Sequence, residues 1–225
     1  MVAIVNLFVG RIGKFHKGDK PMFLEMRTYV LKPGMTNDFV AGFAEGLPAR
    51  LQFSKLLGLF CSEVGGLNRV THVWPYESFE AREKIGAEAR KTGKWPPKVQ
   101  HLILTQENKI VQLAPYSPPL PEKKMGEIYE FRTYTYQPGS MPTVFERWSK
   151  IIGERTKVSP LVFAGQTVIG PLNQYIHVWA YKDAGERERL RAEAMKLQGW
   201  PPATRELLVA QENTVMTPAR CAPFV

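Results

Sequence analysis

The spacing of hydrophobic and polar positions changes along this chain in a fixed order, and the order occurs twice. Alternating positions predict strands and helical spacing predicts helices. The first set of elements, in the order strand, helix, strand, strand, helix, strand, is predicted at residues 23–31, 36–56, 59–64, 69–76, 78–92 and 104–112. The second set is predicted at residues 128–136, 141–157, 162–169, 174–181, 183–198 and 209–217. Each set reads β-α-β-β-α-β, the ferredoxin-like unit with both helices on one face of its sheet.

Turn formers and helix breakers bound these elements. The turn between the two middle strands is Gly65-Gly66-Leu67-Asn68 in the first set, which is favourable turn chemistry. Pro48 is expected to kink or break the first helix, and the second set has no proline there. A Trp-Pro-Pro sequence stops each charged helix. We interpret Trp95 and Trp200 in these sequences as anchors that pin the helix end to the core.

The two sets are copies of one another at a constant offset of 105 residues. Pairing residues 22–112 with 127–217 gives 91 pairs, of which 29 are identical. A repeat of this length suits two small domains in tandem. The expected organisation is an N-terminal arm at 1–21, repeat 1 at 22–112, a proline-rich linker at 113–127, repeat 2 at 128–217 and a C-terminal tail at 218–225. The bare sheet faces of the two α+β units are expected to pack together as a pseudo-symmetric barrel of the dimeric α+β type.

Polar and aromatic residues recur on the central strands of both copies. Strand alternation places Glu25, Arg27 and Tyr29 on one face of the first strand, and His72, Trp74 and Tyr76 on one face of the third. Their counterparts are Glu130, Arg132, Tyr134, His177, Trp179 and Tyr181. We expect the first and third strands to be parallel neighbours, with their apolar faces against the helices. The polar faces would then look into the barrel, where both copies would line one cavity.

Convergent polar groups among aromatic rings are typical of small-molecule sites. His72 and His177 are candidate acid–base groups. Arg27 and Arg132 would hold a carboxylate or another oxyanion, and the two tryptophans would stack on a ring. The remaining substrate-binding candidates are Glu25, Tyr29, Tyr76, Glu130, Tyr134 and Tyr181, together with the turn residues Asn68 and Asn173.

Four other interpretations stay open. The Glu–Arg pairs and histidines could simply satisfy one another inside the barrel. Asn68 and Asn173 could be turn residues alone. His72, His177, Glu25 and Glu130 could form a metal site with two histidines and two carboxylates, although we expect no metal. We also expect no cofactor, and the haem alternative needs an open axial histidine that faces a large apolar cavity.

Charge and composition exclude several classes of protein. The net charge of +9 is spread evenly, without a basic block, so we expect no nucleic-acid partner. No apolar run is long enough to be an integral membrane segment. Cys61 and Cys221 do not match in the repeat, which favours a reducing compartment. We expect the cytoplasm, and the basic residues after the apolar stretch 2–9 leave the mitochondrial matrix as the alternative.

Three motifs resemble the NIPSNAP family over residues 22–217. They are the Glu-x-Arg-Thr-Tyr strand with its Pro-Gly turn, the Gly-x-Leu-Asn-x-x-x-His-Val-Trp-x-Tyr block and the late Gln-Glu-Asn triplet. The resemblance implies a tandem α+β barrel related to cofactor-free monooxygenases and haem-degrading enzymes. Eukaryotic members are mitochondrial and linked to vesicle traffic and mitophagy. The family has no agreed catalytic residues, so the resemblance implies no mechanism.

Two functions follow as expectations. The first is a barrel protein that binds a small molecule and could oxidise or cleave an aromatic or acidic substrate without a cofactor. The alternative is a non-enzymatic interaction or scaffold protein. Enzyme activity, the identity of the ligand and assembly as a homo-oligomer are left open by the sequence.

Overall fold

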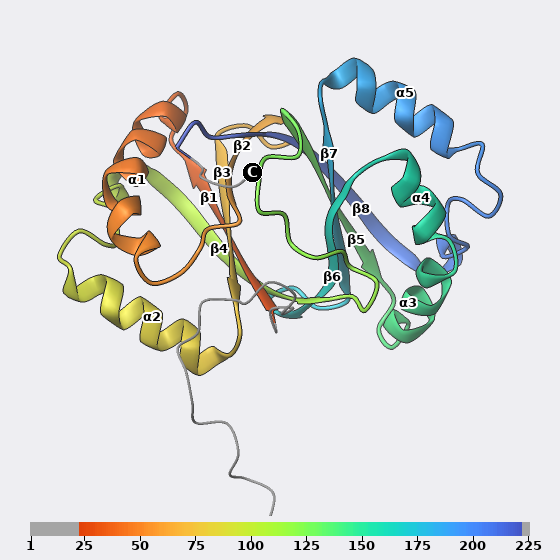
Figure 1. Ribbon diagram of the computed structural model, residues 1–225, viewed down its shortest axis with the longest axis horizontal. Coiled ribbons are helices and arrows are strands. Elements are labelled where there is room, and N and C mark those ends of the chain that lie inside the picture. Colours follow the sequence, from red (N-terminus) through yellow and green to blue (C-terminus); the bar gives the residue numbers. More distant parts are fainter. Residues whose placement is uncertain (1–22, 222–225) are drawn as a thin grey trace, which may run out of the picture.

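The computed structural model describes residues 23–221, which form a closed eight-stranded barrel with helices on two opposite sides (Figure 1). The predicted arm at 1–21 and the last four residues of the predicted tail lie outside the described residues. Hydrogen-bonded strands follow the order β1-β3-β2-β8-β5-β7-β6-β4 around the barrel. The predicted α+β barrel built from two ferredoxin-like units is therefore confirmed.

Each unit contributes four strands and its own helices. The first unit contains β1 (Phe23–Leu31), α1 (Thr36–Leu51), β2 (Gly58–Val64), β3 (Arg69–Tyr76), α2 (Phe79–Lys91) and β4 (Ile103–Leu113), with a short 3-10 turn at Gln100–Leu102. The second contains β5 (Ile128–Tyr136), α3 (Met141–Ser149), α4 (Ile152–Val158), β6 (Leu161–Ile169), β7 (Gln174–Tyr181), α5 (Ala184–Ala194) and β8 (Leu208–Pro218), with a 3-10 turn at Arg205–Leu207.

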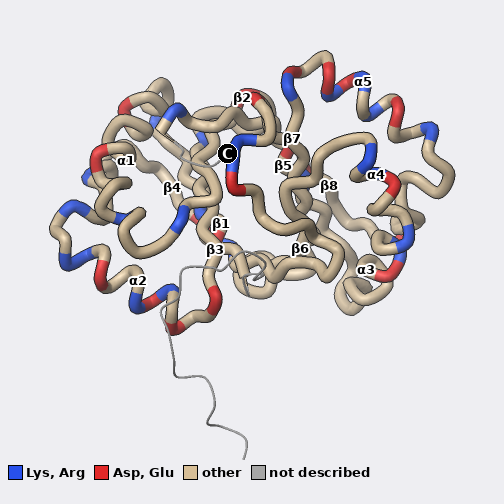
Figure 2. The backbone as a smooth tube through the Cα atoms, viewed as in Figure 1, with Lys and Arg blue, Asp and Glu red and all other residues tan. Residues whose placement is uncertain are grey.

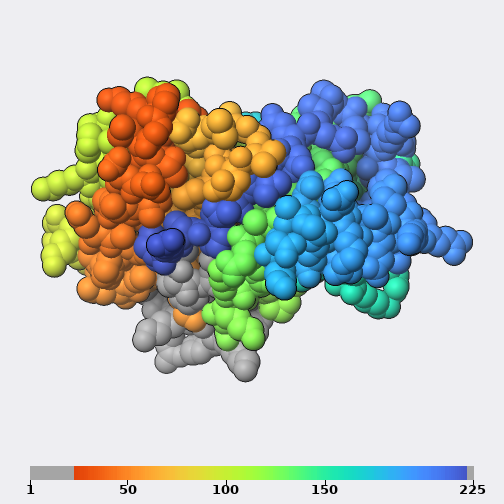
Figure 3. All heavy atoms as spheres, turned by 90° about the horizontal axis from the view of Figure 1, so that it is seen from above, coloured from red at the N-terminus to blue at the C-terminus, as the bar shows by residue number. Residues whose placement is uncertain are grey.

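Two seams between the units close the barrel. β2 pairs with β8, where Cys61 lies opposite Thr217, and β4 pairs with β6, where Gln112 lies opposite Gln166. Viewed from above, the two halves of the chain meet along the middle of the molecule (Figure 3). The seams join both sheets into one continuous hydrogen-bonded surface.

The expectation that the first and third strands run parallel is wrong. β1 and β3 are neighbours, but they are antiparallel, and Glu25 lies opposite Trp74. The crossover through α1 sets β2 parallel to β1, and the tight turn after β2 then reverses the chain into β3. β5 and β7 repeat this arrangement, with Glu130 opposite Trp179.

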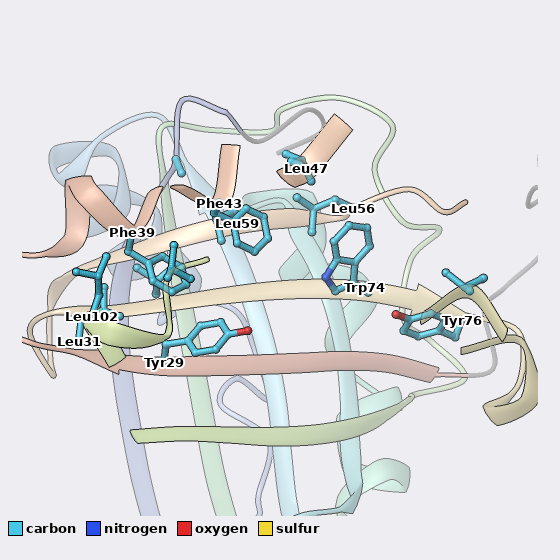
Figure 4. Close-up of a cluster of buried hydrophobic side chains, with 14 of the residues drawn as sticks. Tyr29, Leu31, Phe39, Phe43, Leu47, Leu56, Leu59, Trp74, Tyr76 and Leu102 are labelled. Atoms are coloured by element: carbon cyan, nitrogen blue, oxygen red, sulfur yellow. The ribbon is translucent and has the colours of Figure 1, made fainter. Parts of the chain in front are cut away.

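The predicted orientation of the polar faces is also wrong. The barrel interior is filled by an apolar cluster from both units, made of Leu24, Met26, Leu57, Phe60, Val73, Val111, Tyr129, Phe131, Val162, Phe163, Ile176, Val178, Ala180 and Met216. The opposite face of β1 and β3, which carries Tyr29 and Trp74, packs against Phe39, Phe43 and other residues of α1 (Figure 4). Both faces of each central strand are buried, and the helices bring arginines that can pair with the polar face, which the packed barrel interior cannot do.

The first helix behaves differently in the two units, and opposite to the expectation about Pro48. α1 continues through Pro48, whereas the corresponding stretch of the second unit is divided into α3 and α4 around Ile151, whose φ is −127°. Pro48 removes one hydrogen bond close to the end of α1, and the burial of Phe39, Phe43 and Leu47 holds that helix on the sheet.

The outer surface carries mixed charge. Basic and acidic residues alternate along the outer helices α2 and α5, as Figure 2 shows, with no block of one sign. Among residues 23–221, no helix is long and apolar enough to cross a membrane.

Candidate functional site

Each unit holds a cavity between its sheet and its helices. The first cavity has a volume of about 510 Å³ and is lined by Glu25, Arg27, Arg50, His72, Trp74, Tyr76, Arg82, Glu83, Gly86, Ala87, Arg90 and Trp95. The second has a volume of about 460 Å³ and is lined by Glu130, Arg132, Tyr134, Trp148, Arg155, His177, Trp179, Arg191, Ala192, Ala194, Met195, Trp200, Pro201, Pro202, Thr204, Arg205, Leu208 and Gln211. The helices of the two units flank opposite sides of the barrel (Figure 1), so the prediction of one shared cavity inside the barrel is wrong.

The same separation removes the metal alternative. Glu25 and His72 line the first cavity, whereas Glu130 and His177 line the second. No group of three or more histidine, cysteine or carboxylate side chains within the described part of the chain is arranged to hold a metal ion. The proposed set of two histidines and two carboxylates therefore does not form.

A buried carboxylate lies at the floor of the first cavity. Glu25 Oε1 accepts hydrogen bonds from Arg27 Nη2 at 2.8 Å and from Arg82 Nη2 at 2.7 Å. Burial alone would raise the pKa of Glu25, but the hydrogen bond from Arg82 and the charge of Arg27 outweigh it and lower the pKa to about 2. Glu25 is therefore ionised and holds the two arginines in place.

The second cavity holds its carboxylate with three arginines. Glu130 Oε1 accepts from Arg132 Nη1 at 3.0 Å, Arg187 Nη2 at 2.6 Å and Arg191 Nη1 at 3.1 Å. These contacts overcome the effect of burial and lower the pKa of Glu130. Arg191 stands where the first repeat has Gly86, so the third arginine is a difference between the copies.

The two histidines are buried and make different hydrogen bonds. His72 Nε2 lies 3.1 Å from the hydroxyl of Tyr29. His177 Nδ1 accepts a hydrogen bond of 2.7 Å from the indole Nε1 of Trp179. Burial and the charge of nearby arginines lower the pKa of His72 to about 3 and that of His177 well below its ordinary value. Both rings are therefore neutral at pH 7.

Sequence reasoning missed two arginines that stack on the cavity tryptophans. The guanidinium carbon of Arg50 lies 4.2 Å from the ring centroid of Trp74, and that of Arg155 lies 4.2 Å from the ring centroid of Trp179. Both arginines are almost fully buried. The repeat itself carried the signal, because Arg50 and Arg155 are separated by the same 105 residues as the other matched pairs.

The other arginines that sequence reasoning missed bind the carboxylates. Arg82 on α2 and Arg187 on α5 are also separated by 105 residues, and each bonds to the glutamate of its own unit. These arginines belong to helices, so strand alternation could not place them beside a strand residue 57 positions away. The repeat offset alone would have marked them as candidates.

Most of the predicted site residues come together, although in two groups. Tyr29 does not line the first cavity but contacts His72, and Tyr181 lies behind Glu130, to which its hydroxyl donates at 3.4 Å. Asn68 and Asn173 line neither cavity and have φ values of +53° and +59°. Those values and the hydrogen bond from Gly34 N to Asn68 Oδ1 fit turn residues.

Both cavities carry an excess of positive charge. Four arginines and two glutamates line the first, a net charge of +2 with neutral His72. Four arginines and one glutamate line the second, a net charge of +3 with neutral His177. Trp95 and Trp200 add apolar walls and pack edge-on against Trp74 and Trp179, consistent with the anchoring role expected from the sequence. The arrangement suits an anionic ligand with a flat apolar part.

The closed sheet with a flanked cavity in each half defines a tandem α+β barrel protein. The family model for NIPSNAP matches residues 24–118 and 129–223, one match for each unit. The chain therefore belongs to the NIPSNAP family. It is 29% identical over 212 residues to NipSnap homolog 3B of Mus musculus, covering 90% of this chain and 85% of the relative. It is 28% identical over 213 residues to NipSnap homolog 3A of Homo sapiens, covering 90% and 86%.

Solved structures share the whole barrel. A protein of Fusobacterium nucleatum provisionally named a monooxygenase superposes with a TM-score of 0.70 at 12% identity, covering 89% of this chain and 94% of that one. A protein of Lactobacillus acidophilus with the same provisional name gives a TM-score of 0.64 at 8% identity, covering 89% and 95%. At these identities the likeness establishes the fold alone.

Proposed function

We propose that this protein binds small anionic molecules with a flat apolar part, in the cavities between its sheet and its helices. The observation that supports this proposal concerns Arg155. Its guanidinium is buried against the ring of Trp179, and its Nε and Nη1 have no hydrogen-bond partner. No carboxylate of residues 23–221 lies within ion-pair distance of it. A buried guanidinium with two unpaired nitrogens and no carboxylate beside it is unfavourable, and an anionic ligand provides the missing partner.

The walls of the second cavity favour an aromatic ligand. Trp148, Trp179 and Trp200 all line it, and Trp148 packs edge-on against Trp200 with ring centroids 5.5 Å apart. Flat apolar walls with a few fixed polar groups are typical of small-molecule sites. A volume of about 460 Å³ accommodates a ligand of one or two rings.

Proton transfer by His177 is a further proposal that depends on binding. The fold likeness to proteins provisionally named monooxygenases supports an oxidation without a cofactor, and lyase chemistry is the other class that the site allows. The lowered pKa makes His177 a weak base while the arginine charges are unopposed. A bound anion would oppose those charges and raise the pKa, and a role as base would also require Trp179 to release Nδ1, the nitrogen that carries the lone pair.

We propose that these cavities do not hold haem. His72 and His177 face cavities lined by arginines, and the interior of the barrel is filled by apolar side chains. An axial histidine in front of a large apolar space, which haem would need, is not formed by the described residues.

For the cellular setting we propose the cytoplasm, with the mitochondrial matrix as the alternative. Cys61 and Cys221 are both free thiols, which supports a reducing compartment. Fractionation of the source cells tests the proposed reducing compartment, and recovery of the protein from an oxidising compartment would contradict it. A homo-oligomer also stays a proposal, to be measured by light scattering, because the barrel closes within one chain and needs no second copy for closure.

Binding can be tested with a simple aromatic anion. We expect 4-fluorobenzoate to bind the purified protein in calorimetric titrations, and the double variant Arg50→Gln, Arg155→Gln to abolish the heat of binding. Arg189→Gln is the matched control, because the Arg189 side chain is 64% exposed on α5 and lines neither cavity. If the folded wild type binds none of the anion, the polar residues serve only to hold the barrel together, and the scaffold alternative is the better account.

A further inference from the structure

We propose that the two cavities are not equivalent, and that the second is the principal site for an aromatic carboxylate, whereas in the first the matching arginine is already hydrogen-bonded. The inference rests on the proposed function and adds which cavity acts and what it recognises. The evidence is the pairing of polar atoms, which differs between residues that occupy matching positions in the repeat.

In the first cavity the corresponding donors are already used. Arg50 donates from Nη1 to the hydroxyl of Ser54 at 2.5 Å and from Nη2 to the hydroxyl of Tyr76 at 2.8 Å. His72 Nε2 is paired with Tyr29. Two buried nitrogens stay without partners, His72 Nδ1 and Arg82 Nε, but Arg82 is already ion-paired with Glu25. The terminal donors of Arg50, the counterpart of Arg155, are therefore already paired.

In the second cavity the same residues present free donors. The indole of Trp179 can only donate, so Nδ1 of His177 is the acceptor and the neutral ring carries its proton on Nε2. That Nε2 has no partner, and neither do Nε and Nη1 of Arg155. Three buried N–H donors, two of them on a cation, thus belong to the wall of one cavity. A carboxylate, which only accepts, complements them.

Differences in the chain explain why these donors are free. Ser159 occupies the position of Ser54, but its hydroxyl is unpaired and does not reach Arg155. It follows α4 directly, whereas Ser54 lies three residues beyond the end of the unbroken α1. The hydroxyl of Tyr134 accepts from Arg132 Nε at 2.7 Å and does not pair with His177 Nε2, whereas the hydroxyl of Tyr29 pairs with His72 Nε2.

Two further substitutions favour an aromatic body in the second cavity. Trp148 replaces Phe43, which widens the flat wall beside His177 at a ring-centroid distance of 4.8 Å. Met195 replaces Arg90, which removes a charge from the cavity rim. Arg191 satisfies Glu130, so the carboxylate does not compete with the ligand for Arg155. The ligand class that fits is a planar aromatic monocarboxylate.

The experiment combines stoichiometry with matched variants. Fluorine NMR and calorimetry with 4-fluorobenzoate should show one equivalent bound, and Arg155→Gln and His177→Gln should each weaken binding roughly tenfold or more. The counterparts Arg50→Gln and His72→Gln should change the affinity less than about twofold. In nitrogen-15 spectra of histidine-labelled wild type, the ligand should shift the Nε2 resonance of His177 and leave that of His72 in place.

The outcomes separate this inference from the proposed function. Two equal equivalents, or loss of binding only in the variants of the first cavity, would overturn the inference and leave the proposed function standing. Absence of binding by the folded wild type would overturn both. If a substitution prevents folding, the histidine spectra of the wild type still test the inference. A ligand-induced shift in the resonances of both histidines, or of His72 alone, would contradict it.

Discussion

Arg155 stacks on Trp179 at the same 4.2 Å that separates Arg50 from Trp74, yet only Arg50 has hydrogen bonds on both of its terminal nitrogens. The stack is therefore common to the two halves, whereas the hydrogen bond from Nη1 to a serine hydroxyl is present only in the first. The contribution of each guanidinium to the free energy of unfolding can therefore be compared in the protein without a ligand.

We expect Arg50→Met to lower the free energy of unfolding by about 2 kcal/mol, because it removes two hydrogen bonds and a buried cation–π contact. Arg155→Met should change that free energy by less than about 1 kcal/mol, because Nε and Nη1 of Arg155 make no hydrogen bonds that could be lost and the substitution removes a buried charge. Urea denaturation of the protein without added ligand measures both. An equal loss in the two variants would contradict the unpaired state of Arg155.

The buried carboxylates should be important for stability. Glu25→Gln leaves Arg27 and Arg82 close together without a counter-charge, and we expect it to lower the free energy of unfolding by about 3 kcal/mol. Thermal and urea denaturation provide the measurement. The control is Glu146→Gln, which removes an exposed pair with Lys150 and should leave the stability almost unchanged. Similar losses for the two substitutions would refute the role assigned to Glu25.

Stability should fall when the pH drops below 6.5. The pKa of His72 is lowered from 6.5 to about 3 in the folded protein, so the unfolded chain binds more protons between these values. The contribution is complete above pH 6.5 and is lost as the pH falls, at about 1.4 kcal/mol per pH unit for one histidine well below 6.5. The pKa of Glu25, lowered from 4.5 to about 2, adds a second loss below pH 4.5.

Histidine variants separate these two contributions. His72→Gln should remove about half of the slope between pH 6.5 and 4.5, because His177 still resists protonation, and should leave the added fall below pH 4.5, as measured by denaturation across pH. His101→Gln is the control, because His101 is exposed and lines neither cavity. A profile that is already flat in the wild type over this interval would show that the buried histidines do not resist protonation.

The seam between β4 and β6 should tolerate no side chain at Gly165. A Cβ atom there would lie 2.3 Å from the carbonyl oxygen of Gln112 and 2.9 Å from Val111 Cγ1. Gly165→Ala should therefore lower the free energy of unfolding by about 2–3 kcal/mol in urea titrations. Gly153→Ala on α4, where a Cβ meets nothing within 4 Å, should be neutral or slightly stabilising. Equal effects would mean that the seam can shift to admit the methyl group.

The repeat and its spacing were enough to predict the elements and the closed barrel. β3 and β7 were predicted with the bounds that the structure shows, and the turns at Asn68 and Asn173 follow from local chemistry. Local patterns of this kind act over a few residues, and the constant offset of 105 provided an independent check on each of them.

The direction of the polar faces could not be predicted in the same way. Alternation shows that Glu25 and Arg27 share a face, but a strand that is buried on both sides does not reveal which face meets the helices. The deciding partners are Arg82 and Arg187, which approach from helices 57 residues along the chain from their glutamates. Such distant pairings depend on the assembled fold.

The seams that join β2 to β8 and β4 to β6 have a genetic consequence. In a barrel made from two identical chains, one codon change alters both halves at once, so neither half can lose a function that the other keeps. Here the two halves are encoded separately within one gene. Selection can therefore act on Ser159, Trp148 or Arg191 in one half while the other half continues to stabilise the barrel.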